Sequence, residues 1–220
     1  MKLIKLSLAV ALAASVAFAQ EEKSEIGVSA NMAIASNYVW RGVSQNQDSI
    51  AVQGGVDLDY KGFYLGVWGS NVNFDTDVSI ELDFYGGYSS EIAGIGYDVG
   101  YIQYVYPKDT KALNFGEVYV GLSKDWDQFG VSATYSFGVE TDDTNPEDYW
   151  EIGASTSILP YDIGLQASYG DYNKMGDNYS IGLSKSFEKF DLSVAYIDFS
   201  HDTDSSSDED NVVATVSFSF

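Results

Sequence analysis

The sequence predicts an all-β protein, an up-and-down antiparallel transmembrane β-barrel of about twelve strands. Three observations support this fold class: the composition, the alternation of apolar and polar residues, and the lengths of the connections. Aromatic residues make up 15% of the 220 residues, with 17 Tyr against only 3 Pro. No apolar stripe of helical period is long enough for a helix, so strands are the predicted elements.

Twelve segments alternate between apolar and polar side chains, as strands with two different faces do. They cover approximately residues 28–41, 50–60, 63–70, 80–88, 95–106, 117–123, 129–137, 150–158, 161–169, 179–183, 190–196 and 212–220. In the first segment, Tyr38 and Trp40 share the apolar face with Val28, and Arg41 ends the polar face. The polar faces consist mainly of Gly, Ser, Asp and Glu. We therefore expect lipid outside and a wet lumen inside.

The connections alternate in length. Tight turns join the second to the third, the eighth to the ninth and the tenth to the eleventh segment. Longer polar links cover residues 42–48, 71–77, 107–114, 140–148, 171–177 and 200–211. Outer-membrane barrels have short turns at one end and long loops at the other. This rhythm therefore predicts a barrel in the outer membrane, in contact with its lipids and lipopolysaccharide.

Both ends of the chain fit an exported barrel. A basic start, an apolar run from Leu6 to Phe18 and the sequence Ala17-Phe18-Ala19 predict a cleaved signal peptide over residues 1–19. A polar lead-in over 20–27 and the barrel over 28–220 would follow. Loss of Lys2 and Lys5 would change the formal charge from -22 to -24.

The last strand ends on an aromatic residue. Alternate residues share its apolar face: Val212, Ala214, Val216, Phe218 and Phe220. A terminal Phe beside such a stripe is typical of the closing strand of an outer-membrane barrel, and the last strand of a soluble sandwich is the alternative. The strand resembles the signal that the barrel-assembly machinery reads, so Phe218 and Phe220 are the predicted assembly signal.

Charged residues on the polar faces are the candidate pore-lining residues. They are Arg41, Asp57, Glu81, Asp83, Asp98, Glu117 and Glu151. Arg41, the only arginine, would face Glu81, Asp83 or Glu117 at a constriction, or form a structural bridge that neutralises buried carboxylates. Rings of carboxylates favour cations in a channel, although ordinary lumen polarity is the alternative.

Other ligand classes receive less support from the sequence. The acidic segments 201–210 and 141–148 offer oxygen ligands for divalent cations, yet they lack the spacing of an EF-hand, so solvated loops are the alternative. We predict no metal site, cofactor or catalytic residue. A formal charge of -22 argues against nucleic acid as a partner. The absence of cysteine excludes disulfides.

Four stretches carry a resemblance to a known family. They are Ala35–Gln45, Gly62–Val72, Glu81–Tyr88 and Tyr97–Tyr101. Through about Gly121 the chain resembles the Gcw_chp family of proteobacterial proteins, also called TorF-type porins. The resemblance implies an outer-membrane porin.

Three functions follow as hypotheses. The leading one is a passive, cation-preferring channel for small hydrophilic solutes. The first alternative is a structural or adhesive barrel whose lumen is plugged by aromatic side chains: Tyr64, Trp68, Tyr85, Tyr104 and Tyr119. The second is an outer-membrane hydrolase, which would need a Ser–His pair on the wall. Because the single histidine, His201, falls in a predicted loop, the sequence favours a protein that is not an enzyme.

Overall fold

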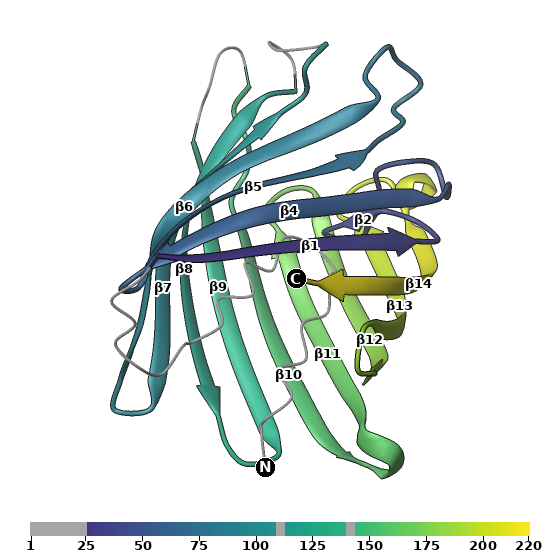
Figure 1. Cartoon of the computed structure of the whole chain (residues 1–220). Helices are drawn as coiled ribbons and strands as arrows, with labels where there is room; N and C mark the ends of the chain where they lie inside the picture. Colours follow the sequence, from purple (N-terminus) through teal and green to yellow (C-terminus); the bar gives the residue numbers. More distant parts are fainter. Residues whose placement is uncertain (1–25, 109–112, 140–143) are drawn as a thin grey trace.

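Twelve antiparallel strands close into a barrel in the computed structural model, which describes residues 26–108, 113–139 and 144–220 (Figure 1). The wall strands are β1 (Gly27–Ala35), β4 (Ala51–Tyr60), β5 (Phe63–Asn71), β6 (Ile80–Ile92), β7 (Ile95–Val105), β8 (Phe115–Asp125), β9 (Phe129–Val139), β10 (Tyr149–Leu159), β11 (Ile163–Tyr172), β12 (Gly176–Ser186), β13 (Asp191–His201) and β14 (Glu209–Ser219). The predicted fold class is confirmed. The predicted signal peptide and residues 20–25 of the lead-in lie outside the described residues.

Each strand pairs with its neighbour in the sequence, and β14 pairs with β1 to close the ring. At this seam, residues Asn31–Ala35 pair with Thr215–Ser219. Two further backbone hydrogen bonds join Ala30 and Phe220, at 3.2 and 2.8 Å. In Figure 1, β1 and β14 cross the front at a steep angle to β8–β11 behind them, as closure of a tilted sheet requires.

The outer surface of the barrel is apolar. Exposed side chains on it include Val52, Leu65, Phe84, Val120, Ile152 and Val194. Their strand neighbours point inward, so the predicted alternation of the two faces is confirmed. Within the described residues, no helix is both long and apolar enough to cross a bilayer.

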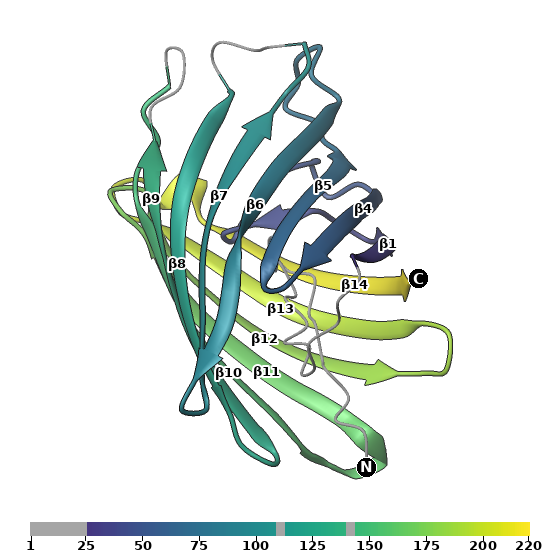
Figure 2. The ribbon, with the colours of Figure 1, turned by 60° about the vertical axis from the view of Figure 1, so that its left-hand side comes forward.

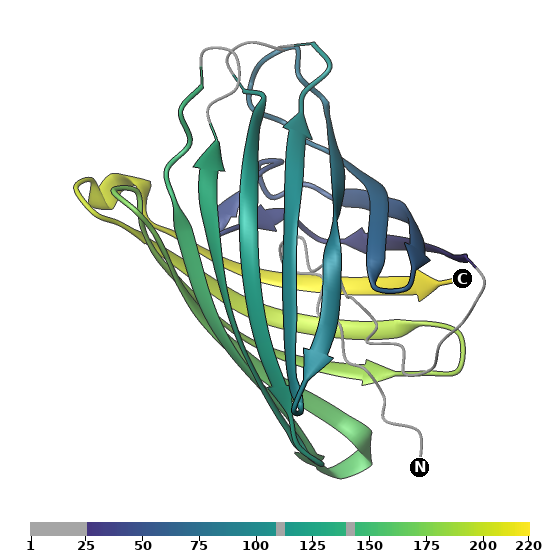
Figure 3. The same ribbon diagram turned by 90° about the vertical axis from the view of Figure 1, so that its left-hand side faces the viewer.

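The two ends of the barrel differ in the length of their connections (Figures 2 and 3). At the short-turn end, strands are joined by residues 61–62, 93–94, 126–128, 160–162 and 187–190, and both ends of the barrel chain lie there. At the long-loop end, the connections are residues 36–50, 72–79, 106–114, 140–148, 173–175 and 202–208. The predicted long loop 171–177 is wrong, because β11 and β12 extend until only three residues separate them.

The first long connection folds into the lumen. The chain leaves the wall after Ala35, forms the short strands β2 (Val39–Trp40) and β3 (Val43–Ser44), and returns at Ala51. We call residues 36–50 the inner hairpin. The prediction that Tyr38 and Trp40 lie on the lipid face of the first strand is wrong, since Tyr38 is only 4% exposed. Inside the lumen the Tyr38 hydroxyl finds a hydrogen-bond partner, which lipid could not supply.

Candidate functional site

A two-residue turn places the tip of the inner hairpin. Arg41 and Gly42 both have positive φ, +48° and +91°, as the central pair of a type I′ hairpin turn requires. A Cβ atom at Gly42 would lie 2.7 Å from the Cβ of Phe199 on β13 and 2.9 Å from that of Asn178 on β12. The tip therefore sits directly on the β12–β13 wall, where only glycine fits.

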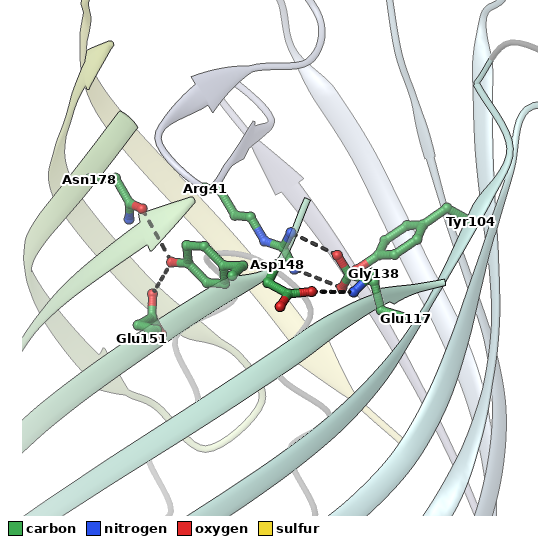
Figure 4. Close-up of polar contacts among 8 residues, drawn as sticks. Arg41, Tyr104, Glu117, Gly138, Asp148, Glu151 and Asn178 are labelled. Carbon is green, nitrogen blue, oxygen red and sulfur yellow. Dashed lines mark hydrogen bonds and ion pairs between the residues drawn. The ribbon is translucent and has the colours of Figure 1, made fainter. Parts of the chain in front are cut away.

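From this tip, Arg41 reaches across the lumen. Its guanidinium donates two hydrogen bonds to the Glu117 carboxylate on β8, at 2.8 and 2.7 Å (Figure 4). The β8 and β13 walls lie nearly opposite each other in the ring. Arg41 is 5% exposed and Glu117 1%. Glu117 is one of the three carboxylates that the sequence offered as partners for Arg41.

Aromatic rings surround the guanidinium. Its central carbon lies 4.2 Å from the ring centroid of Trp40, 4.1 Å from that of Tyr149 and 4.9 Å from that of Tyr172. Such positions favour a cation. Burial lowers the pKa of Arg41, but the adjacent Glu117 carboxylate raises it above its ordinary value. The hairpin tip therefore carries a fixed positive charge.

Polar contacts hold the rest of the inner hairpin. The Asn37 amide donates to Asp48 at 2.7 Å and to Asn211 on β14 at 2.8 Å. The Asn46 side chain accepts from the backbone N–H of Tyr38 at 3.1 Å and donates to a backbone carbonyl at 2.6 Å. These hydrogen bonds act together with the apolar packing of Tyr38 and Val39, which belong to the hydrophobic core of the lumen.

Tyrosine hydroxyls donate to five of the six predicted lumen carboxylates. The pairs are Tyr38 and Tyr106 with Glu81 (2.7 and 2.6 Å), Tyr104 with Glu117 (3.3 Å), Tyr64 with Asp98 (2.7 Å), Tyr149 with Glu151 (3.0 Å), and Tyr85 with Asp57. Hydrogen bonds of this kind stabilise an ionised carboxylate. Burial, with help from Glu81, raises the pKa of Tyr38, so this hydroxyl keeps its proton.

Asp83 is the sixth predicted lumen carboxylate, and it differs from the others. Its side chain lies on the inner face of β6, is 0% exposed, and neither carboxylate oxygen has a hydrogen-bond partner among the described residues. Trp68 on β5 and Tyr104 on β7 are its neighbours across the sheet. The structure thus brings Glu81, Asp83 and Glu117 together beneath a single cation.

The lumen has two distinct halves. At the level of the inner hairpin, every wall strand contributes a buried inward residue: Ala35, Ala51, Ser70, Asp83, Tyr104, Glu117, Ser136, Tyr149, Gly170, Asn178, Ile197 and Val213. The half towards the short turns, which we call the vestibule, is lined by polar residues that are half-buried or exposed: Asn31, Asp57, Asp98, Ser132, Ser155, Ser193 and Ser217. The hairpin therefore fills one half of the lumen, whereas polar side chains of the other half stay half-buried or exposed.

The predicted loop residues have local roles. His201 ends β13 rather than lying in a loop, and its Nδ1 accepts from the backbone N–H of Thr203 (3.2 Å) and Asp204 (3.1 Å). No serine hydroxyl bonds to it in the described part of the chain. Ser206 donates to Asp204 and lowers its pKa. Of the acidic segment 141–148, residues 141–143 lie outside the described residues. Elsewhere, the described ranges contain no group of side chains arranged to hold a metal ion.

Several site residues were missed from the sequence: Tyr106, Asn46, Tyr149 and Tyr172. The sequence contains a signal for the hairpin turn. The pair Arg41-Gly42 ends in glycine, which favours the positive φ that a two-residue turn requires. The prediction of one strand over residues 28–41 is wrong, because Tyr38 and Trp40 continue the alternation although β1 ends at Ala35. The stretch Ala35–Gln45, which carries the family resemblance, contains most of the inner hairpin.

Comparison with solved structures identifies the fold. The KdgM porin in complex with disordered oligogalacturonate is 12% identical, with a TM-score of 0.58 over 88% of this chain and 97% of that one. Outer membrane phospholipase A from Escherichia coli is 13% identical (TM-score 0.53; 87% and 89% covered). The Salmonella typhi outer membrane phospholipase dimer with bound calcium is 14% identical (TM-score 0.55; 86% and 90% covered). These likenesses show the fold, a closed antiparallel β-barrel of the kind found in outer-membrane proteins.

Comparison of sequences gives the family. No curated protein sequence matches the chain. A family model described as "Bacterial protein of unknown function (Gcw_chp)" matches residues 19–220. That range includes the inner hairpin and all twelve wall strands. The chain belongs to the Gcw_chp family.

Proposed function

We propose that the protein is a passive outer-membrane channel for small hydrophilic solutes, with a preference for cations, and that the inner hairpin is its gate. One observation carries this proposal: a vestibule with half-buried and exposed polar residues leads from the short-turn end to a hairpin whose anchors on the wall include an ion pair and hydrogen bonds. A barrel serving only as a scaffold has no need of an acidic, water-lined vestibule. The vestibule is thus an entrance to a path that the hairpin controls.

Cation preference follows from the charges along this path. The vestibule carries Asp57 and Asp98, both half-buried, whereas the one arginine is neutralised by Glu117. A lumen lined by charge of one sign concentrates ions of the opposite sign. The preference should weaken at high salt, because roughly molar ionic strength shortens the Debye length to about 3 Å.

The hairpin fills the lumen at the level of the ring of buried inward residues. Conduction therefore requires the hairpin to shift. Its anchors are the Arg41–Glu117 ion pair and hydrogen bonds such as that of Asn37 with Asn211. When the hairpin lifts, water can hydrate the freed ions and amides, which offsets part of the cost of breaking these contacts. The channel should therefore alternate between a closed state and a conducting state.

Conductance across a planar bilayer tests the proposal. The purified protein should open in discrete steps, and reversal potentials in a salt gradient should favour cations. A variant with residues 37–49 replaced by a short Gly-Ser linker should conduct continuously. The double variant Asp57→Asn/Asp98→Asn should lose much of the cation preference. Anion preference at low salt would contradict the electrostatic part of the proposal.

A permanently plugged structural barrel is the second candidate. The complete ring of buried inward residues around the hairpin favours it. In that case, the wild-type protein would never conduct, while the variant lacking residues 37–49 would. The two candidates are therefore separated by the wild-type recording alone.

The route to the membrane is part of the proposal. Residues 1–19 would direct export, and Phe218 and Phe220 would be read by the barrel-assembly machinery, with lipopolysaccharide surrounding the long-loop end. The backbone of Phe220 pairs with Ala30, while its side chain is exposed. Replacing Phe220 by Ser should lower the yield of folded barrel in outer-membrane fractions. Equal yields would show that the terminal aromatic is incidental.

A further inference from the structure

Asp83 is the one predicted lumen carboxylate without a donor in the described part of the chain. Glu81, two residues away on β6, accepts from two tyrosines, and Glu117 accepts from Arg41 and Tyr104. If all three carboxylates were ionised, the single positive charge of Arg41 would leave two negative charges buried beneath the hairpin. Of these two charges, that of Glu81 is stabilised by two hydroxyl donors, whereas that of Asp83 has no donor, so Asp83 is where a compensating positive charge is needed most.

A proton meets this need better than a metal ion. An ionised carboxylate that is buried without a partner is strongly unfavourable and tends to neutralise itself. A metal ion such as Ca²⁺ needs six to eight oxygen ligands, and no group of acidic side chains in the described ranges is arranged as a metal site. The oxygens of Glu81 and Glu117 are already engaged. A proton needs only one oxygen of Asp83.

We propose that Asp83 is a proton-binding site beneath the inner hairpin, and that the bound proton keeps the hairpin seated in the lumen. The second half of this inference rests on the proposed channel function, and the first half does not. The titratable and charged groups that face Asp83 come from its own strand, from β7, from β8 and from the hairpin: Glu81, Tyr85, Tyr104, Tyr106, Glu117, Tyr38 and Arg41.

Among these groups, Asp83 is the carboxylate that has no donor to hold its negative charge. The tyrosine hydroxyls act as donors, Arg41 stays charged against Glu117, and Glu81 and Glu117 each accept hydrogen bonds from these groups. When the pH rises and Asp83 loses its proton, a third negative charge forms beside two others. Electrostatic repulsion among the three carboxylates and the hydration that the new charge requires then favour a state in which the hairpin moves away from Asp83. Conductance should therefore increase with pH.

Infrared difference spectroscopy tests the proton site without reference to transport. At neutral pH, the wild-type protein in lipid vesicles should show the carbonyl stretch of a protonated carboxylic acid, shifted in D₂O. Asp83→Asn should abolish this band, and the vestibule variant Asp98→Asn should keep it. If the wild type lacks the band, or if Asp83→Asn retains it, the site assignment is overturned.

Conductance as a function of pH tests the coupling to the hairpin. Release of one proton can raise the open-to-closed ratio at most about tenfold per pH unit. Wild type and Asp127→Asn, a variant in the exposed turn between β8 and β9, should show this rise, while Asp83→Asn, a mimic of the protonated state, should stay closed at all pH values. A pH response in Asp83→Asn equal to that of wild type overturns the coupling. If the infrared band is present but the wild type never conducts, the coupling and the channel function are both overturned. If the wild type conducts but lacks the band, the proton site alone is overturned.

Discussion

The two halves of the lumen use the same residue types in opposite ways. Around the inner hairpin, Glu81 and Glu117 are almost completely buried and are fixed by tyrosines and by Arg41. In the vestibule, Asp57 and Asp98 each have a single tyrosine donor and remain half-buried. The difference shows that the surroundings of a carboxylate decide its role. In the filled half, carboxylates are held by fixed partners, and in the vestibule we propose that they attract cations.

The physical cause is the dielectric environment. Charges packed under the hairpin interact strongly but lose hydration, so each needs a partner. Charges that face water keep their hydration and contribute little to stability. Removing the partner of a buried charge in the filled half should therefore lower the free energy of unfolding more than removing a charge in the vestibule.

The largest effect is expected at Glu117. Glu117→Ala leaves the Arg41 guanidinium buried without its counter-charge and should lower the free energy of unfolding by about 3–5 kcal/mol. The matched vestibule variant Asp98→Ala should lower it far less. Urea unfolding in lipid vesicles, followed by tryptophan fluorescence, measures both. Equal losses would remove the distinction between the two halves.

The outer face provides the next largest effect. Val194 points to lipid from β13, so Val194→Lys should cost about 2–4 kcal/mol if it lies at mid-bilayer depth. Its neighbour Ser193 points into the vestibule, where Ser193→Lys should be mild. Both variants can be followed by the same unfolding measurement. Reversed sensitivities would mean that the two faces of the wall are assigned the wrong way round.

A smaller effect is expected at the tip of the hairpin. Gly42→Ala forces a side chain into a left-handed backbone conformation and against Phe199 and Asn178, which should cost about 1–3 kcal/mol. Gly121 on β8 is the control, because an added Cβ there would meet no atom closer than 3.7 Å. If Gly121→Ala destabilised the barrel as much as Gly42→Ala, close seating of the tip would not be the cause.

The smallest effect concerns one hydroxyl. Tyr38→Phe removes a donor from Glu81 but leaves Tyr106 in place, so the loss should be about 1–2 kcal/mol. In the vestibule, Tyr64→Phe removes the tyrosine donor of the half-buried Asp98 and should cost less. Thermal unfolding read from heat-modifiable gel mobility compares the two. A larger loss for Tyr64→Phe would reverse the expected order.

The wall of the barrel was predictable because its signal is local. Each wall strand meets lipid on one side and water or polar groups on the other, so alternation reports both the strand and its faces. Val194 and Ser193 illustrate this, since adjacent residues already differ in polarity. The identity of the inward carboxylates followed from the same pattern.

The inner hairpin was not predictable in the same way. The Arg41-Gly42 pair indicates a turn, but Tyr38 and Trp40 continue the alternation of β1, so the local pattern does not show that the chain turns into the lumen. The contact that fixes the hairpin joins Arg41 to Glu117, 76 residues later in the chain. Polarity alone placed both residues in the lumen, but only the closed ring brings them within bonding distance. The lack of a partner for Asp83 likewise depends on side-chain geometry.

An engineered disulfide tests the central claim, that the hairpin controls flow through the lumen. The chain has no cysteine, and the Asn37 side chain of the hairpin contacts that of Asn211 on β14 at 2.8 Å, so this pair can be replaced by two cysteines. In Asn37→Cys/Asn211→Cys, oxidation should suppress channel openings and reduction should restore them, while each single variant should ignore the redox state. Equal conductance of the oxidised and reduced double variant, with the disulfide shown to have formed, would contradict the account.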